Sequence, residues 1–138
     1  MKSDESIASI MSTDLLITHE DRPVSEVRQL MASRGVHHIL VVAGTQLLGV
    51  VSMSDILALS YSEFSDDGSL SDALLDERCT LGGLMKRSPV TIQVGASVRD
   101  AARAMSSGDF HSLPVVDGGN ALVGIVTSTD LIRYLVGD

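Results

Sequence analysis

The sequence has few of the residues that specialised sites need. Its 138 residues include one cysteine, three prolines and no tryptophan, and only 3% of them are aromatic. Because Cys79 is alone, the chain can form neither an internal disulfide nor a redox pair, and it cannot complete a thiolate zinc site. Cys79 is interpreted either as a buried, inert residue or as a redox-responsive thiol beside Arg78.

Positive charge and long apolar runs are also scarce. Ten basic residues stand against 18 acidic ones, which gives a net charge of -8. Binding to a phosphate backbone draws on clustered lysine and arginine, so no nucleic-acid partner is expected. No stretch reaches the roughly 18 apolar residues of a membrane-spanning helix. We therefore expect no membrane association and a cytoplasmic location.

An internal repeat organises the chain. Residues 11–57 align with residues 85–132, with one residue inserted in a turn of the second copy. The matched pairs are Met11–Met85, Val24–Val98, Met31–Met105, His37–His111, Val41–Val115, Val42–Val116, Gly49–Gly124, Val51–Val126 and Asp55–Asp130. We expect residues 1–138 to form one module, with repeat one at 10–59, a linker at 60–83 and repeat two at 84–136.

Each copy is predicted to run strand, helix, strand, strand, helix. The strands are expected at 15–17, 39–43 and 47–51 in copy one, and at 90–92, 113–116 and 122–126 in copy two. Between the first and second strands, apolar residues recur at helical spacing. Pro23 and Gly35 bracket the first such helix, and Ser97 with Asp100 forms a capping box that opens its counterpart, which Gly108 closes. The crossover helix predicts that the first strand lies parallel to a neighbour.

A three-stranded repeat of about 47 residues leaves too much apolar surface wet, so the two copies are expected to pack together. In the connector, residues 60–69 are expected to be a loop and residues 70–75 a short helix. The connector is acidic, and it is interpreted as a solvated segment or, alternatively, as a metal site, although no D-x-D-x-D-G calcium loop is present. Its acids are Glu63, Asp66, Asp67, Asp72, Asp76 and Glu77.

Three segments of the second copy carry a resemblance to a known family. They are Met85-Lys86-Arg87-Ser88-Pro89-Val90-Thr91-Ile92, Phe110-His111-Ser112-Leu113-Pro114-Val115-Val116-Asp117 and Gly124-Ile125-Val126-Thr127-Ser128-Thr129-Asp130-Leu131. With its less faithful first copy, the chain resembles a tandem pair of cystathionine beta-synthase (CBS) domains, a Bateman module, over residues 10–135. The resemblance implies an α/β (α+β) fold of two β-α-β-β-α repeats packed with pseudo-two-fold symmetry.

The same resemblance implies a stand-alone sensor that binds an adenosine ligand and regulates a partner protein in trans. Ser52 with Asp55, and Thr127 with Asp130, fit the S/T-x-x-D pattern at a helix start. Either pair can be a capping box alone. In the family, the aspartate accepts hydrogen bonds from the ribose hydroxyls while the helix start faces a phosphate. The two roles are compatible.

The resemblance also implies two clefts, each of which combines residues of both copies. One takes Asp55, Ser52 and Ser54 with Thr91, Phe110, His111, Ser112 and Pro114; the other takes Asp130, Thr127 and Thr129 with Leu16, Val36, His37 and His38. Phe110 occupies a position where some relatives stack an aromatic ring on adenine, so the first cleft is expected to be the better purine site. Core packing remains the alternative for Phe110.

His37 and His111 match a family position that reaches nucleotide phosphates, and each can equally be a hydrogen-bonded strand residue. His37 and His38 are adjacent and would point to opposite faces of a strand, so no metal site is expected. Lys86 and Arg87 could add positive charge for phosphates. The ligand can be AMP, ADP, ATP, S-adenosylmethionine or a dinucleotide.

An enzyme is not expected, because the chain lacks the G-x-x-x-x-G-K-S/T, G-x-S-x-G, H-E-x-x-H and C-x-x-C motifs. A structural dimerisation module with empty clefts is the alternative function. In either case a homodimer is expected, since the apolar helix faces exceed what one sheet can cover. These faces are Val24-Val27-Met31, Val98-Ala101-Met105, Ile56-Leu57 and Leu131-Ile132-Leu135.

Overall fold

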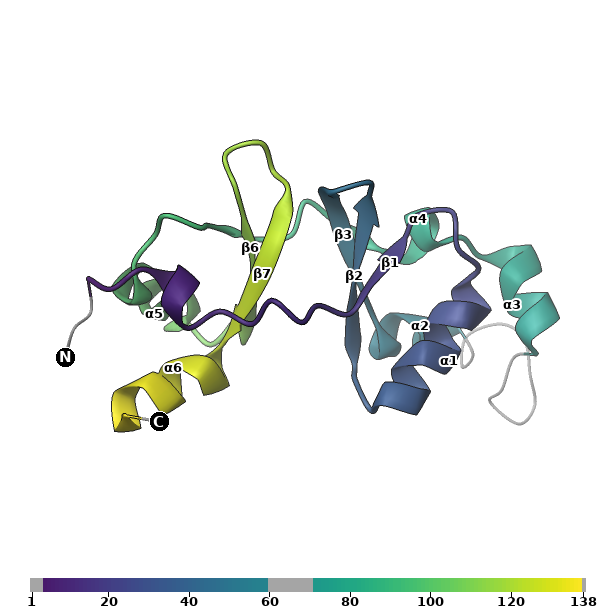
Figure 1. Ribbon diagram of the computed structural model, residues 1–138. Helices are drawn as coiled ribbons and strands as arrows, with labels where there is room; N and C mark the ends of the chain where they lie inside the picture. Colours follow the sequence, from purple (N-terminus) through teal and green to yellow (C-terminus); the bar gives the residue numbers. More distant parts are fainter. Residues whose placement is uncertain (1–3, 60–70, 138) are drawn as a thin grey trace. The chain divides into compact units, whose positions relative to one another are not determined.

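The computed structural model describes residues 4–59 and 71–137 (Figure 1). The chain forms two compact units. The repeat-one unit comprises Leu16–Pro89, and the repeat-two unit comprises Met1–Leu15 together with Val90–Asp138. Each unit has its own sheet and its own hydrophobic core.

The repeat-one unit contains the predicted strand, helix, strand, strand, helix order. These elements are β1 (Ile17–His19), α1 (Val24–Arg34), β2 (His38–Ala43), β3 (Gln46–Ser52) and α2 (Met53–Leu59), followed by α3 (Asp72–Arg78), α4 (Leu81–Leu84) and β4 (Lys86–Arg87). The sheet order is β1-β2-β3-β4. The first strand pairs in parallel with β2, as the crossover helix predicts, and the remaining pairs are antiparallel.

The repeat-two unit repeats this order. It contains the short 3-10 helix η1 (Ile7–Ser9), then β5 (Ile92–Gln93), α5 (Val98–Met105), β6 (Ser112–Val116), β7 (Leu122–Thr127) and α6 (Ser128–Val136). The sheet order is β5-β6-β7, again with the first strand parallel to the second and the hairpin antiparallel. The α/β architecture of two β-α-β-β-α repeats is confirmed.

Three predicted segments differ from the structure. The first strands begin two residues later than predicted, at Ile17 and Ile92, where parallel pairing with Leu40 and Val115 starts. The connector helix begins at Asp72 rather than at residue 70, because the Ser71 hydroxyl caps it, and it continues to Arg78. The proposed loop at 60–69, with Glu63, Asp66 and Asp67, lies outside the described residues.

Each sheet is extended by a segment that precedes the first strand of the other repeat in the sequence. We call residues 7–12 and 81–87 the leader segments. In the repeat-two unit, Ser12 and Ile125 exchange two backbone hydrogen bonds of 2.8 and 2.9 Å. In the repeat-one unit, Lys86 pairs with Val50 in the same manner. Each compact unit therefore contains the leader segment that, in the sequence, comes before the first strand of the other repeat.

The leader segments also supply core side chains. Ile7 is fully buried in the core of the repeat-two unit, and Leu81 is fully buried in the core of the repeat-one unit. Gly49 and Gly124 make room for the leader segments. A Cβ at Gly49 would lie 2.6 Å from the Lys86 carbonyl oxygen, and a Cβ at Gly124 would lie 2.6 Å from the Met11 sulfur. The repeated glycines thus permit the close approach of each leader segment.

The prediction that the helices have exposed apolar faces is wrong for the first helix of each repeat. The apolar stripes of α1 and α5 are buried inside their own units, so they cannot serve as a dimer surface. Their members are Val24, Val27, Met31, Val98, Ala101 and Met105. Ile56 is buried as well, whereas Leu57, Ile132 and Leu135 are exposed as expected.

The described connector acids Asp72, Asp76 and Glu77 are exposed, as expected for a solvated segment, but two of them make contacts with α1. The Asp76 carboxylate accepts hydrogen bonds from the backbone N–H of Ser25, at 2.9 Å, and from its hydroxyl, while Asp72 forms an ion pair with Arg28. These contacts hold α3 against the start of α1. Cys79 is a half-buried free cysteine that packs against the repeat-one core.

Candidate ligand-binding pockets

The junction between the hairpin and the second helix has the same geometry in both units. In the repeat-two unit, the Thr127 hydroxyl accepts from the Asp130 backbone N–H at 3.1 Å, and the Asp130 Oδ2 accepts from the Thr127 backbone N–H at 2.8 Å. In the repeat-one unit, Ser52 and Asp55 make the same two bonds at 3.1 and 3.2 Å. The predicted capping boxes are therefore confirmed.

The capping bonds leave part of each carboxylate available. Within the described residues, no hydrogen bond is recorded to the Oδ1 atom of Asp55 or of Asp130. An ionised carboxylate oxygen accepts hydrogen bonds and can bind neighbouring hydroxyl groups. Each aspartate can thus cap its helix and bind a ligand through its second oxygen.

A pocket of about 390 Å³ opens at this junction in the repeat-one unit. It is lined by His38, Val50, Ser52, Asp55, Leu84 and Lys86. Asp55, His38 and Ser52 come from the repeat itself, whereas Leu84 and Lys86 come from the leader segment. The pocket therefore has an acid on one element and a lysine on another.

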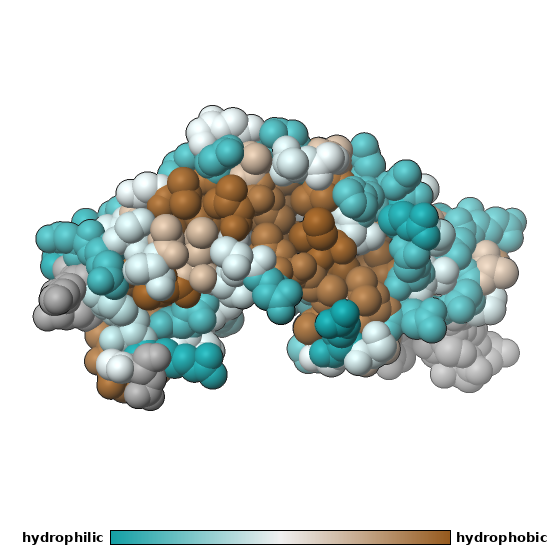
Figure 2. Space-filling view, in the orientation of Figure 1, coloured by the Kyte–Doolittle hydropathy of each residue, from teal (hydrophilic) through white to brown (hydrophobic). Residues whose placement is uncertain are grey.

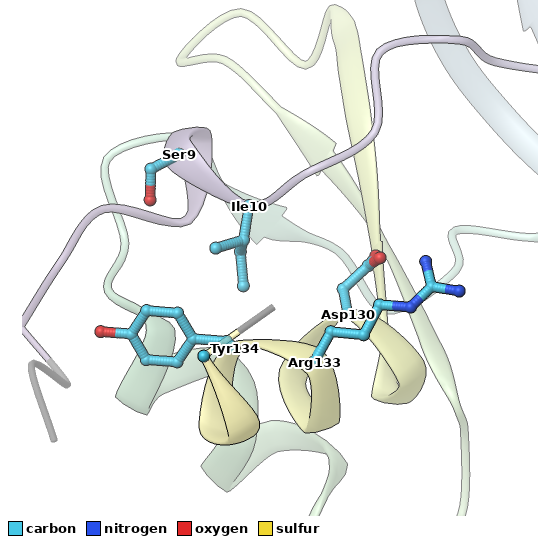
Figure 3. Close-up of a pocket in the computed structure, with 6 residues that line it drawn as sticks. Ser9, Ile10, Asp130, Arg133 and Tyr134 are labelled. Carbon is cyan, nitrogen blue, oxygen red and sulfur yellow. The ribbon is translucent and has the colours of Figure 1, made fainter.

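A second pocket, of about 540 Å³, lies in the repeat-two unit (Figure 3). It is lined by Ser9, Ile10, Asp130, Arg133, Tyr134 and Gly137. In Figure 3, Ile10 points from the leader segment toward α6, with Tyr134 on one side and Asp130 with Arg133 on the other. Both pocket volumes fall within the roughly 300–1,000 Å³ typical of small-molecule sites.

Two of the residues that line each pocket correspond through the sequence repeat. Ile10 matches Leu84, and Asp130 matches Asp55. The positive charges do not correspond. Lys86 aligns with Ser12, and Arg133 aligns with Ala58, and neither Ser12 nor Ala58 lines a pocket.

The other predicted ligand residues have varied surroundings. Pro114 is buried; Leu16, Val36, Thr91 and Phe110 are half-buried; Ser54, His37, His38, His111, Ser112 and Thr129 are exposed. Phe110 packs against the repeat-two core, and Leu16 and Val36 pack against the repeat-one core. The structure brings His38, Ser52 and Asp55 together around one pocket. The predicted combinations of residues from both copies remain predictions.

The backbone carbonyls of the two aligned histidines accept hydrogen bonds from the starts of α2 and α6. The His37 carbonyl accepts from the Met53 N–H, and the His111 carbonyl accepts from the Ser128 N–H, both at 2.8 Å. These bonds satisfy an amide in the first turn of α2 and of α6. The exposed imidazoles remain available to solvent or to a ligand.

Sequence reasoning missed most residues of the repeat-two pocket. Ile10 directly precedes Met11, and Leu84 directly precedes the matching Met85. The two apolar residues therefore occupy equivalent positions, and the sequence repeat could have identified them. No repeat signal marked Arg133 or Tyr134, because the first copy has Ala58 and Leu59 there.

The pKa of the Tyr134 hydroxyl is shifted by its surroundings. Desolvation, followed by the nearby negative charge of Glu5, raises the pKa of Tyr134 above its ordinary value. The hydroxyl is therefore protonated at neutral pH and can donate a hydrogen bond.

Within residues 4–59 and 71–137, no helix has both the length and the apolar character needed to cross a membrane. The same residues contain no group of three histidine, cysteine, aspartate or glutamate side chains placed to hold a metal ion.

The fold and pockets define a protein of paired α/β repeats, each with an acidic helix start that lines a ligand-sized pocket. The chain belongs to the CBS domain family, whose model matches residues 7–62 and 81–137. Two CBS segments in one chain make it a CBS-domain pair.

Solved structures of similar proteins share this fold. CBSX2, a CBS-pair protein from Arabidopsis thaliana, is 26% identical to this chain, with a TM-score of 0.81 and coverage of 96% of this chain and 95% of CBSX2. CBSX2 has also been solved in complex with AMP. The CBS domain pair of protein MJ0100, in complex with 5'-methylthioadenosine and S-adenosyl-L-methionine, is 25% identical, with a TM-score of 0.71 and coverage of 96% of each chain.

Curated relatives are often longer. Protein MJ1225 from Methanocaldococcus jannaschii is 24% identical over 132 residues, which are 95% of this chain and 47% of MJ1225. The inosine-5'-monophosphate dehydrogenase of Korarchaeum cryptofilum is 26% identical over 123 residues, which are 89% of this chain and 23% of that enzyme. The chain thus spans less than half the length of these two relatives.

Proposed function

We propose that this protein is a regulatory module that binds an adenosine ligand and transmits its occupancy to a partner protein in the cytoplasm. The observation that carries the proposal is that each pocket is lined by a helix-capping aspartate whose Oδ1 atom accepts no hydrogen bond within the described residues. A ribose offers two adjacent hydroxyls that such an oxygen can accept from.

The relatives support an adenosine ligand. CBSX2 has been crystallised with AMP, and the MJ0100 pair with 5'-methylthioadenosine and S-adenosyl-L-methionine. We therefore propose AMP, ADP, ATP or S-adenosylmethionine as the ligand class. Lys86 and His38 line the repeat-one pocket and could bind an anionic group there. The proposed role is regulatory rather than catalytic, consistent with the lack of common catalytic motifs.

Calorimetric titration with these four compounds tests the proposal. Wild-type protein should bind at least one of them, and Asp55→Ala or Asp130→Ala should weaken binding by about 1.5–3 kcal/mol, the range for hydrogen bonds to charged groups. Asp100→Ala is the matched control, since Asp100 forms the same kind of capping box on α5 but lines neither pocket.

The control separates capping from binding. All three variants lose the carboxylate half of a capping box and should lose stability, yet only Asp55→Ala and Asp130→Ala should lose affinity. The earlier expectation that Asp55 serves the better purine site predicts a larger loss for Asp55→Ala. Absence of binding by all four compounds would leave the structural dimerisation module as the better reading.

We also propose a homodimer. The exposed apolar side chains of α6 support this proposal, with Ile132 59%, Leu135 63% and Val136 65% exposed. In Figure 2 the α6 end of the repeat-two unit shows a small apolar area at the edge of the view. A second copy could cover this face, since a symmetric dimer uses one patch twice. Light scattering should give twice the chain mass of 14.6 kDa.

Ile132→Glu and Leu135→Glu should reduce that mass to one chain without unfolding the protein. Met105→Glu is the comparison variant: its side chain is buried, so this change should unfold the repeat-two unit. A monomeric wild type, with and without ligand, would contradict the homodimer.

A further inference from the structure

The repeat-two pocket contains an arginine that its counterpart lacks. Arg133 lies three residues after Asp130 on α6, and both side chains line the pocket. Residues three apart on a helix lie on neighbouring positions of one face. The matching residue in repeat one is Ala58, whose side chain has no hydrogen-bonding group.

The guanidinium of Arg133 is available for a ligand. The ion pairs recorded for the described residues are Arg22 with Glu26 and Arg28 with Asp72, so Arg133 takes part in neither. Arg133 is exposed, and Figure 3 shows its side chain beside that of Asp130. An arginine fork matches the geometry of a phosphate and can bind it through two parallel hydrogen bonds.

The opposite side of the pocket is suited to a flat apolar group. Ile10 points from the leader segment toward α6, and the half-buried ring of Tyr134 lies away from Asp130 and Arg133 in Figure 3. Aromatic rings pack favourably against other flat rings, and aliphatic side chains add apolar contact. The pocket thus presents an apolar end, a carboxylate and a cation.

We propose that the repeat-two pocket selects a phosphorylated nucleotide over the free nucleoside, with Arg133 as the residue that binds the phosphate. Asp130 binds the ribose, and Tyr134 with Ile10 contacts the base. The inference rests on the proposed adenosine-binding function and adds a specificity residue to one of its two pockets. In a chain with a net charge of -8, a local cation is needed to offset repulsion of an anionic ligand.

Calorimetric titration of the full chain with AMP and with adenosine tests the proposal. The variants are Arg133→Ala, Arg133→Lys and Arg103→Ala, each also measured with Asp55→Ala to weaken the repeat-one site. Arg103 is the matched control because it is an exposed arginine on α5 of the same unit and does not line the pocket.

Wild-type protein should bind AMP at least tenfold more tightly than adenosine. Arg133→Ala should lose about ten- to a hundredfold in AMP affinity, as expected for a charge-assisted hydrogen bond, and keep its adenosine affinity. Arg133→Lys should recover only part of the AMP affinity, because an ammonium keeps the charge but cannot make the two parallel hydrogen bonds, and Arg103→Ala should match the wild type.

Two results would overturn the inference while leaving the proposed function intact: equal wild-type affinities for AMP and adenosine, or an Arg133→Ala variant that binds AMP as tightly as the wild type. An Arg133→Ala variant that loses both ligands equally also contradicts phosphate selection. Failure of the wild type to bind AMP, ADP, ATP, adenosine or S-adenosylmethionine would overturn the proposed function, and this inference with it.

Discussion

The two units build the same helix start with different residues. In the repeat-two unit, α5 is capped by its own Ser97 and Asp100. In the repeat-one unit, Pro23 occupies the matching position and has no side chain that can cap α1, so Asp76 of α3 accepts from the Ser25 N–H instead. A local capping box and a carboxylate from a distant helix therefore fill the same role. The comparison shows that duplicated repeats can keep a contact while changing its source.

The leader segments give a second comparison, in which the two units are alike in form but differ in the atom nearest the repeated glycine. A Cβ at Gly124 would lie nearest the Met11 sulfur, at 2.6 Å, with the Ser12 carbonyl oxygen at 3.1 Å, whereas a Cβ at Gly49 would lie nearest the Lys86 carbonyl oxygen, at 2.6 Å. A side chain can move aside, but a hydrogen-bonded backbone cannot move without disturbing its strand.

Loss of a buried leader side chain should have the largest effect. Ile7→Ala and Leu81→Ala should each cost about 2–5 kcal/mol of unfolding free energy, because both side chains are fully buried in the core of a unit. Urea denaturation measures the loss, with the exposed Val90→Ala as control. Terminal segments often fray, so a loss below about 0.5 kcal/mol for Ile7→Ala would show that its leader segment does not stabilise the unit.

A methyl group added at the repeated glycines should destabilise the two units by different amounts. Gly49→Ala should cost about 1–3 kcal/mol, because its Cβ would clash with the Lys86 carbonyl oxygen. Gly124→Ala should cost less, since the Met11 side chain can rotate away. The same denaturation assay measures both. Met11→Ala should partly rescue Gly124→Ala, and a greater cost at Gly124 than at Gly49 would contradict the comparison.

Removal of either cap should cost a similar, smaller amount. Asp76→Ala and Ser97→Ala should each lose about 0.5–2 kcal/mol, the range for an N-cap side chain. Glu77→Ala is the matched control for α3, because Glu77 is exposed on the same helix. Thermal unfolding followed by circular dichroism provides the measurement. An Asp76→Ala variant as stable as the control would mean that α3 does not cap α1.

The smallest effect concerns two matching acids, Glu26 and Asp100. The Ser97 backbone N–H, followed by its hydroxyl, lowers the pKa of Asp100, whereas the hydrogen bond from Arg22 lowers the pKa of Glu26. Each folded-state pKa is depressed, so each contribution to stability is present above about pH 4 and is lost as pH falls through the folded-state value.

Salt distinguishes the two causes. In a carboxyl NMR titration, about 0.5 M salt should move the pKa of Glu26 toward its ordinary value more than that of Asp100, because salt screens an exposed ion pair. Asp100→Asn should also flatten the loss of stability on acidification. Equal salt sensitivity of the two carboxyls would contradict the assigned causes.

The repeat, the order of elements and the capping boxes could all be predicted from the sequence. These features depend on local rules: apolar spacing distinguishes helix from strand, and serine or threonine three residues before an acid marks a helix start. The alignment of Gly49 with Gly124, and of Met11 with Met85, was also visible in the sequence. It did not reveal that each leader segment pairs with the hairpin of the other repeat.

The residues that complete each unit and each pocket became clear from contacts between segments far apart in the sequence. Ile7 and Leu81 enter cores formed by residues far away in the sequence, and Asp76 caps a helix about 50 residues earlier. Arg133 has no repeated counterpart, so its place in a pocket depends on how α6 packs beside the leader segment. Such contacts follow from the three-dimensional packing of distant segments, which neither local spacing nor residue type encodes.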